Sequence, residues 1–255
     1  MDAEATAGLA GAQRQARTDL AACYRLVAHF GMSDLVYNHI TSRLPGTDHH
    51  LLINAYGYLY DEIRASNLVT IALDGTEIDN PAGADTGYGV NQAGYVIHGA
   101  IHEARPDVSC VIHTHSRAGM AVSAMACGLL PITQTAMRFA DIAYHDYEGP
   151  AVDLAERRRL VTDLGEGNAM ILRNHGLLVA GPSVAQAFNT LYWLEMACRA
   201  QVDAMAAGTP LTQPSPDVIA HTHRLYQPQV RRPFGEMEWP AMLRLLDRKD
   251  SSYRE

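Results

Sequence analysis

The sequence predicts an α/β fold in a single domain. Short apolar runs typical of buried strands, such as residues 108–112 and 169–172, alternate with longer stretches in which apolar residues recur at helical spacing. The chain has 255 residues, of which 47% are hydrophobic and 19% charged. This length can bury a sizeable core, and the composition is ordinary for a globular protein. The chain shows neither an internal repeat nor a domain boundary within residues 13–207.

The first half is predicted to begin with a helix and to continue with strands. Residues 1–12 are rich in Ala and Gly and are expected to be loose. From Gln13 to Phe30 apolar residues recur at helical spacing, and Gly31 ends the pattern. Runs bounded by turn residues then predict strands. In order, these are residues 35–44, 51–54, 68–73 and, after the Asp74-Gly75 turn, Glu77-Ile78, followed by a loop over residues 79–90.

The second half alternates helices with short strands. Asn91 is a suitable N-cap for a helix that ends before Pro106, and Ser116 for one that ends near Ala126. The longest helix is expected from Ser183 to Gly208, with one apolar stripe. The other expected elements are strands 108–115, 142–144, 169–173 and 177–180 and helices 153–164, 216–226 and 236–247. The last two helices form a tail, residues 208–255, appended to the main domain of residues 13–207.

Charge and cysteine content exclude several classes of protein. The net charge of −8 leaves no basic patch for nucleic acid or an anionic membrane surface. Apolar runs stay below the ~18 residues that a membrane span needs, and the N-terminus lacks the pattern of a signal peptide. Four scattered cysteines without a CxxC pair are typical of reduced thiols. We therefore expect a cytoplasmic protein with neither nucleic-acid nor membrane partners.

Three histidines at strand ends form the candidate site. His113 and His115 close an apolar run, and their spacing places both side chains on one face of a strand. His175 follows a second apolar run, residues 169–172. Three imidazoles with an open fourth position are typical of a catalytic transition-metal site. The alternative is that these are structural histidines with polar partners.

Several motifs of the chain, taken in order, resemble those of the class II aldolase/adducin family. The resemblance covers roughly residues 15–205 and is closer to the adducin-like branch than to the sugar-phosphate aldolases. Separated motifs in the same order are a more specific signal than any one alone. They are YNHITSR from Tyr37, ASNLV from Ala65, VNQAG from Val90, ARPD from Ala104, HTH from His113, GLLP from Gly128, YHDY from Tyr144 and LRNHGL from Leu172.

The resemblance implies a fold, an assembly and a cofactor. The fold would be an α/β domain with a central mixed sheet covered by helices, and the assembly a homotetramer with active sites at subunit boundaries. His113, His115 and His175 match the metal ligands of the family. We expect one divalent transition metal per subunit, zinc in the first place, with manganese and iron as alternatives.

One departure from the family pattern bears on the reaction. Catalytic members carry a Ser-Ser-Glu motif, in which the Glu is an acid/base group and the serines help to hold a substrate phosphate; here these positions are Gln92, Ala93 and Gly94. We therefore expect a carboxylate-bearing substrate without a phosphate. Asn38 matches a substrate-contacting position, and Gln92 is a second candidate contact. His98, one helical turn after Gly94, is the candidate replacement for the acid/base group.

These observations favour a metal-dependent lyase, a decarboxylase or aldolase acting on a small oxo- or hydroxy-acid. The metal would act as a Lewis acid that stabilises an enolate. Decarboxylation needs no general base, so the loss of the Glu affects it least. A non-haem iron oxygenase could use the same three histidines. A non-catalytic interaction module, as in the adducin head domain, is the third reading.

Overall fold

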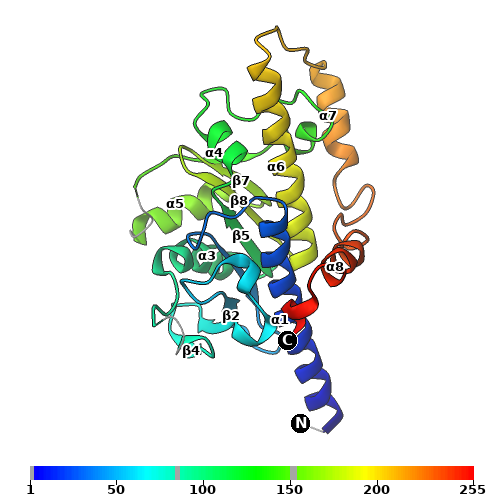
Figure 1. Cartoon of the computed structure of the whole chain (residues 1–255). Coiled ribbons are helices and arrows are strands. Elements are labelled where there is room, and N and C mark those ends of the chain that lie inside the picture. The colour runs from blue at the N-terminus through cyan, green and yellow to red at the C-terminus, as the bar shows by residue number, and fades with distance from the viewer. Residues whose placement is uncertain (1–2, 84–86, 150–153) are drawn as a thin grey trace.

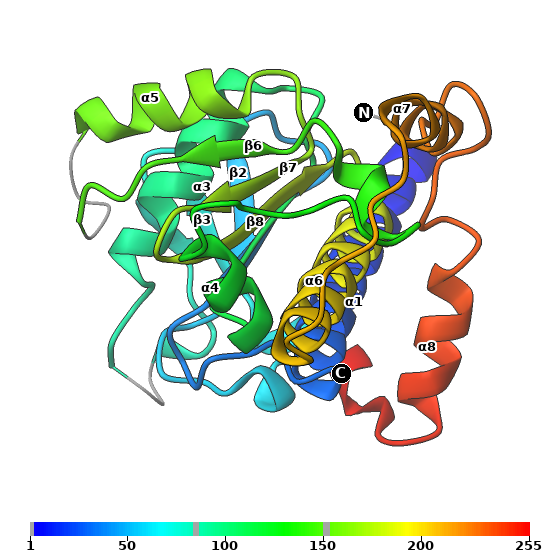
Figure 2. The same cartoon turned by 90° about the horizontal axis from the view of Figure 1, so that it is seen from above.

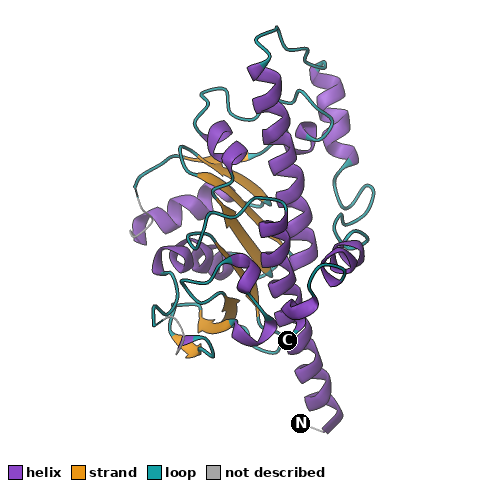
Figure 3. Cartoon of the chain, viewed as in Figure 1, coloured by secondary structure: helices purple, strands orange, loops and turns teal. Residues whose placement is uncertain are grey.

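Eight strands form one mixed sheet at the centre of the chain in the computed structural model, which describes residues 3–83, 87–149 and 154–255 (Figures 1 and 3). The strand order is β4-β3-β2-β1-β5-β8-β7-β6, and all neighbours are antiparallel except β6 and β7, which are parallel. The strands are β1 (His39–Arg43), β2 (His50–Ile53), β3 (Val69–Ala72), β4 (Glu77–Asp79), β5 (Cys110–Thr114), β6 (Ala143–His145), β7 (Ala169–Leu172) and β8 (Gly176–Gly181).

Helices cover both faces of the sheet and make three layers (Figure 2). Side chains alternate between the faces along each strand. In β5, Val111 faces α3 and α5, and Ile112 joins the cluster packed by α1, α4 and α6. The helices are α1 (Ala3–His29), α3 (Gln92–Ala104), α4 (Arg117–Ser123), α5 (Leu154–Leu164), α6 (Val184–Ala206), α7 (Pro216–Leu225) and α8 (Trp239–Asp247). The α/β fold predicted from the sequence is confirmed.

The N-terminal segment differs from the expectation. We expected residues 1–12 to be loose, whereas α1 begins at Ala3. Alanine has the highest helix propensity, so the Ala-rich segment extends the helix beyond its buried part. The buried part starts at Leu20. In Figure 1 the first turns of α1 project away from the rest of the fold.

The first strand is shorter than predicted. Residues 35–38 form a turn before β1, in which Leu35 has a φ of 45° and the Tyr37 amide donates to the Asp34 carbonyl. The pattern of β-branched and aromatic residues cannot reveal this turn, because the turn depends on contacts with residues distant in the sequence, such as that between Asp34 and His115. Asp153, the first residue of the helix predicted over 153–164, lies outside the described residues.

The C-terminal residues 208–255 contain the expected helices, and they also complete the main core. Trp239 and Tyr253 belong to the largest hydrophobic cluster, together with residues of α1 and α6. The indole nitrogen of Trp239 donates to Asp19 on α1 at 2.8 Å. The Arg138 guanidinium lies 4.6 Å from the centre of the Tyr226 ring and so links the end of α7 to the core. The end of α7 and the residues from Trp239 to Tyr253 therefore pack against the main domain.

The helices and the cysteines have two further properties. Among the described residues, none of the helices combines the length and apolar character that a membrane span requires. All four cysteines are free thiols, and three of them are buried.

The hydroxyl of Tyr24 joins α1 to two strands, which leads to a test of the fold. It accepts from the backbone amides of Ile40 and Asn54 at 2.9 and 3.1 Å, and its ring is fully buried. Tyr24→Phe leaves both amides without this acceptor, so we expect a loss of about 1–3 kcal/mol in the free energy of unfolding. Urea unfolding at a fixed protein concentration measures the loss, with Tyr56→Phe, whose side chain is partly exposed, as the control. Equal stability of the two variants would contradict the role given to Tyr24.

Candidate metal centre

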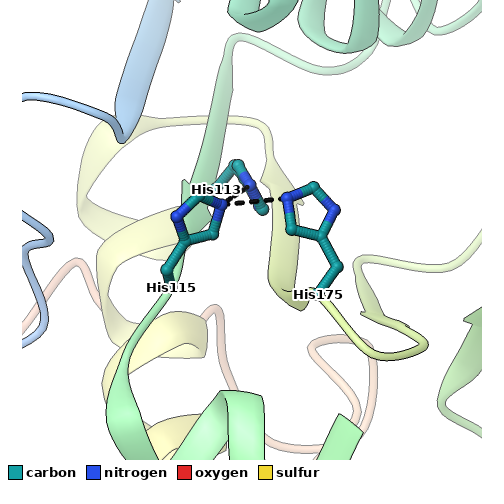
Figure 4. A group of neighbouring side chains, drawn as sticks. All are labelled: His113, His115 and His175. Atoms are coloured by element: carbon teal, nitrogen blue, oxygen red, sulfur yellow. Dashed lines mark hydrogen bonds between the residues drawn. The ribbon is translucent and has the colours of Figure 1, made fainter. Parts of the chain in front are cut away.

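Three imidazole rings converge at one end of the central strands (Figure 4). The Nε2 atom of His115 lies 2.9 Å from the Nε2 atoms of both His113 and His175. The three possible ligand atoms all lie within 4.8 Å of one another. The histidines predicted from strand ends and from family motifs therefore form one cluster.

Local backbone geometry places each ring. His113 lies in β5 and His115 just after it, so the strand alternation points both toward the same space. His175 lies in the tight turn between β7 and β8, where Asn174 has a φ of 55°, a conformation that Asn tolerates better than most residues. The next residue must be small, because a Cβ on Gly176 would collide with the carbonyl oxygen of Thr114.

Acceptors behind the rings determine which nitrogens carry protons. The Nδ1–H of His113 donates to the carbonyl of Leu177 at 2.9 Å, and the Nδ1–H of His115 donates to the carboxylate of Asp34 at 3.0 Å. A neutral imidazole has one N–H, so both Nε2 atoms present lone pairs to each other. Two lone pairs at 2.9 Å repel unless an electron-pair acceptor lies between them. The donor set therefore fits a metal cation, and the acceptors behind the ligands are those of known metal sites.

Burial favours the neutral form of the ligands. It lowers the pKa of His113 well below its usual value, with the charges of His175 and His115 adding to the effect. The pKa of His175 falls to about 4, again mainly through burial. Neutral imidazole is the form that binds a metal. His113 and His175 are thus in the binding state at neutral pH.

A second group of buried histidines lies behind the cluster. His39 faces His113 across the β1–β5 pair, with ring centres 5.4 Å apart, and stacks on His98 at 4.5 Å. The Nδ1 atom of His98 lies 2.8 Å from the hydroxyl of Thr41, which also contacts His102. The structure therefore separates His98, the expected acid/base group, from the ligands by the ring of His39.

Asn38 and Gln92 are the two candidate substrate contacts. Asn38 precedes β1 and is buried, and its side-chain nitrogen and oxygen lack hydrogen-bond partners among the described residues. Such unpaired buried atoms are rare and need a reason, and a bound ligand is one. Gln92 lies in the first turn of α3, but its side chain lies outside the described part of the structure.

Sequence reasoning missed Asp34 and underrated His39. Asp34 is 81 residues from His115, in a stretch predicted as the approach to a strand, so only the tertiary fold reveals their contact. His39 was not among the residues predicted for the site. Its position opposite His113 follows from the strand register, which the sequence does not give.

Comparisons with known proteins point to one family. The family model for the class II aldolase and adducin N-terminal domain matches residues 18–202. A Pseudomonas aeruginosa protein named for the class 2 aldolases is 41% identical over 259 residues, spanning all of this chain and 98% of its own. Mouse alpha-adducin is 42% identical over 91% of this chain, which spans only 33% of that longer protein.

Two solved structures are also similar. An aldolase II superfamily protein from Pseudomonas syringae has a TM-score of 0.88 and 48% identity, with 96% of each chain covered. L-fuculose 1-phosphate aldolase from Glaciozyma antarctica has a TM-score of 0.83 and 27% identity, covering 97% of this chain and 94% of its own.

The ligand assignment predicts selective loss of metal. His113→Ala and His175→Ala should each lose bound metal while keeping the fold, because each removes one of three nitrogen donors. Metal content by elemental analysis and far-UV circular dichroism test this. His49→Ala is the matched control, since His49 is exposed and outside the cluster. Full metal occupancy in both ligand variants would refute the site.

The contact between Asp34 and His115 predicts a graded effect. Asp34→Ala removes the acceptor that fixes the tautomer of His115 but leaves all three donors in place. We expect metal affinity to fall about 10- to 100-fold, the usual cost of losing such a partner. Competition with a chelator of known affinity measures it. Asp48→Ala, a similar substitution at an exposed position, should bind like the wild type.

Proposed function

The chain belongs to the class II aldolase and adducin family, and we propose that it is a metal-dependent lyase that decarboxylates or cleaves a small oxo- or hydroxy-acid. The observation that carries the proposal is the set of three convergent Nε2 atoms, two of which present lone pairs because their Nδ1 protons are held by Leu177 and Asp34. We propose zinc as the metal, with iron and manganese as the alternatives, because imidazole ligands are typical of zinc and iron sites.

His113, His115 and His175 would hold the metal. When bound, it supplies Lewis-acid stabilisation of negative charge that develops on a substrate oxygen. The chain itself positions the substrate. Asn38 offers an unpaired amide donor and acceptor within a buried segment next to β1, where they can orient an acid group. Gln92 is the second proposed contact.

We propose that His98 acts through its neighbours. Stacked on His39, which packs edge-to-face against His113, it holds the ligand ring from behind. Burial lowers the pKa of His98 well below its ordinary value and that of His39 to about 3. Both rings are therefore neutral at working pH, so the stack supports the ligand without placing a positive charge beside a cation.

The sequence around Gly94 supports an acid substrate without a phosphate. The fuculose 1-phosphate aldolase among the similar structures is named for a phosphorylated sugar. Here Gln92 and Ala93 stand where the family motif has its phosphate-holding serines, and Gly94 stands where it has the acid/base Glu. A decarboxylation generates its own carbanion, so it tolerates the loss of that carboxylate.

The likeness to mouse alpha-adducin supports a second candidate, a non-catalytic interaction module. Against it stand the three buried imidazoles, whose desolvation would be costly without a metal. We rank the module below the enzyme for that reason.

We also propose a homotetramer in the cytoplasm. Exposed apolar side chains lie close to the metal site in the chain, including Leu35 and Tyr37 next to Asp34, and Tyr147 beside His175. Covering them with a neighbouring subunit would remove apolar surface from water. The free cysteines agree with a reducing compartment.

Turnover tests the proposal. Protein loaded with zinc, manganese or iron should release carbon dioxide or an aldehyde from a panel of 2-oxo and 3-oxo acids. Removal of the metal should lower the rate at least about 100-fold, because Lewis-acid stabilisation is worth several kcal/mol. Readdition of metal should restore the rate.

The other outcomes separate the alternatives. Oxygen uptake by the iron-loaded protein would favour the oxygenase. Tight metal binding without turnover on any of these acids would overturn the lyase and favour the interaction module.

A further inference from the structure

The three ligand histidines differ in their outer hydrogen bonds. The Nδ1 atom of His113 faces Leu177 and that of His115 faces Asp34. The Nδ1 atom of His175 points away from the other two rings (Figure 4), and within the described chain it lacks a direct partner. Metal-bound histidines almost always donate this second N–H. An acceptor for His175 should therefore lie on the side that Figure 4 shows its Nδ1 facing.

A small cavity borders His175. It has a volume of about 10 Å³ and is lined by His145 and Glu156 as well as by His175 itself. About 10–15 Å³ holds one water molecule, provided that two to four polar groups surround it. The cavity thus has the size and the lining of a single-water site.

His145 offers one acceptor to this cavity. Its Nδ1–H donates to the carboxylate of Asp163 at 2.7 Å, and in the neutral ring this leaves a lone pair on Nε2. The ring is buried, and Nε2 lacks a hydrogen-bond partner among the described residues. A buried acceptor without a partner is costly, so a donor is expected nearby.

Glu156 offers the second acceptor. It is buried, and its Oε1 atom lies 3.8 Å from Nε2 of His145. This is too long for a direct hydrogen bond, but two acceptors at this separation can share one water that donates to each. Asp163 and Glu156 lie seven residues apart on α5, two helical turns, so both reach His145 from the same helix face.

We propose that His145 and Glu156 are the outer-shell acceptors of the third metal ligand, acting through one water in this cavity. The water accepts from Nδ1–H of His175 and donates to Nε2 of His145 and to Oε1 of Glu156. The three atoms Nδ1 of His175, Nε2 of His145 and Oε1 of Glu156 then each have a partner. The two residues are positioning residues: they fix the tautomer of His175 and increase its basicity toward the metal.

The backbone holds this arrangement in place. β6 pairs in parallel with β7, which sets His145 beside Leu172, and the amide of Arg173 donates to the carbonyl of His145 at 2.8 Å. The turn that carries His175 is therefore tied directly to the strand that carries His145. The proposal rests on the metal site of the proposed function but not on any particular reaction.

Zinc affinity tests it. Glu156→Leu and His145→Leu should each weaken zinc binding about 10- to 100-fold, measured by chelator competition. The double variant should be little weaker than either single one, because both act through the same water. Glu156→Gln keeps one acceptor oxygen and should recover part of the loss. The visible spectrum of the cobalt-loaded protein should change more in the two leucine variants than in Glu156→Gln.

The control is Glu166→Gln, which removes one negative charge at an exposed position away from the cavity and should bind zinc like the wild type. Wild-type affinity and an unchanged cobalt spectrum in both leucine variants would overturn the proposal. If circular dichroism shows that the leucine variants do not fold, the near-isosteric Glu156→Gln replaces them in the test. Wild-type zinc affinity together with an unchanged cobalt spectrum in Glu156→Gln would then overturn the proposal.

The outcome is separable from that of the proposed function. If the wild type binds zinc through its three histidines and turns over none of the oxo acids, the reaction is wrong and the outer-shell test still stands. If His175→Ala retains zinc, the site itself is wrong and both fail.

Discussion

The metal site depends on the repulsion between the Nε2 lone pairs of two neighbouring histidines. The Nε2 atoms of His113 and His115 lie 2.9 Å apart, and the hydrogen bonds to Leu177 and Asp34 direct a lone pair of each toward the other. A protein keeps such a contact only where something between the atoms accepts electron density. Protonation of one ring would also relieve the repulsion. Burial opposes this at His113, because it lowers the pKa of the ring. A bound cation is the arrangement that satisfies all of these groups at once.

The sheet makes this convergence possible by supplying strands that end together. The antiparallel pair β5–β8 sets His113 opposite Leu178, so the carbonyl of Leu177 is within reach of the imidazole. The turn before β8 returns His175 to the same end. On the other side of β5, the register with β1 brings His39 behind His113. The ligands therefore lie on rigid strands or their immediate ends, and α3 and α5 supply the residues that support them.

Sequence reasoning recovered what is local and missed what is distant. The alternation of side chains along a strand was enough to place His113 and His115 together, and the motif around His175 identified the third ring. Most elements were also predicted, because apolar periodicity and capping residues are properties of neighbouring positions. The site partners Asp34 and His39 escaped, since each depends on a strand register or a turn that brings together residues far apart in the chain. The turn at residues 35–38 is an example: a strand-like composition there gives way to a geometry that allows Asp34 to reach His115.

The placement of carboxylates also bears on what the site can bind. The family motif puts a Glu close to the metal, whereas this chain has Gly94 there, and its nearby acids, Asp34 and Glu156, lie behind the imidazoles. Three neutral nitrogen donors leave the full charge of a divalent cation uncompensated, while an additional carboxylate would halve it. In a site of low dielectric that difference is large, and it favours a ligand that brings its own negative charge. An oxo acid does so through its carboxylate and offers a second oxygen beside it. In the proposed function, the loss of the Glu would therefore shift the preference of the metal site toward acids, in addition to removing an acid/base group from it.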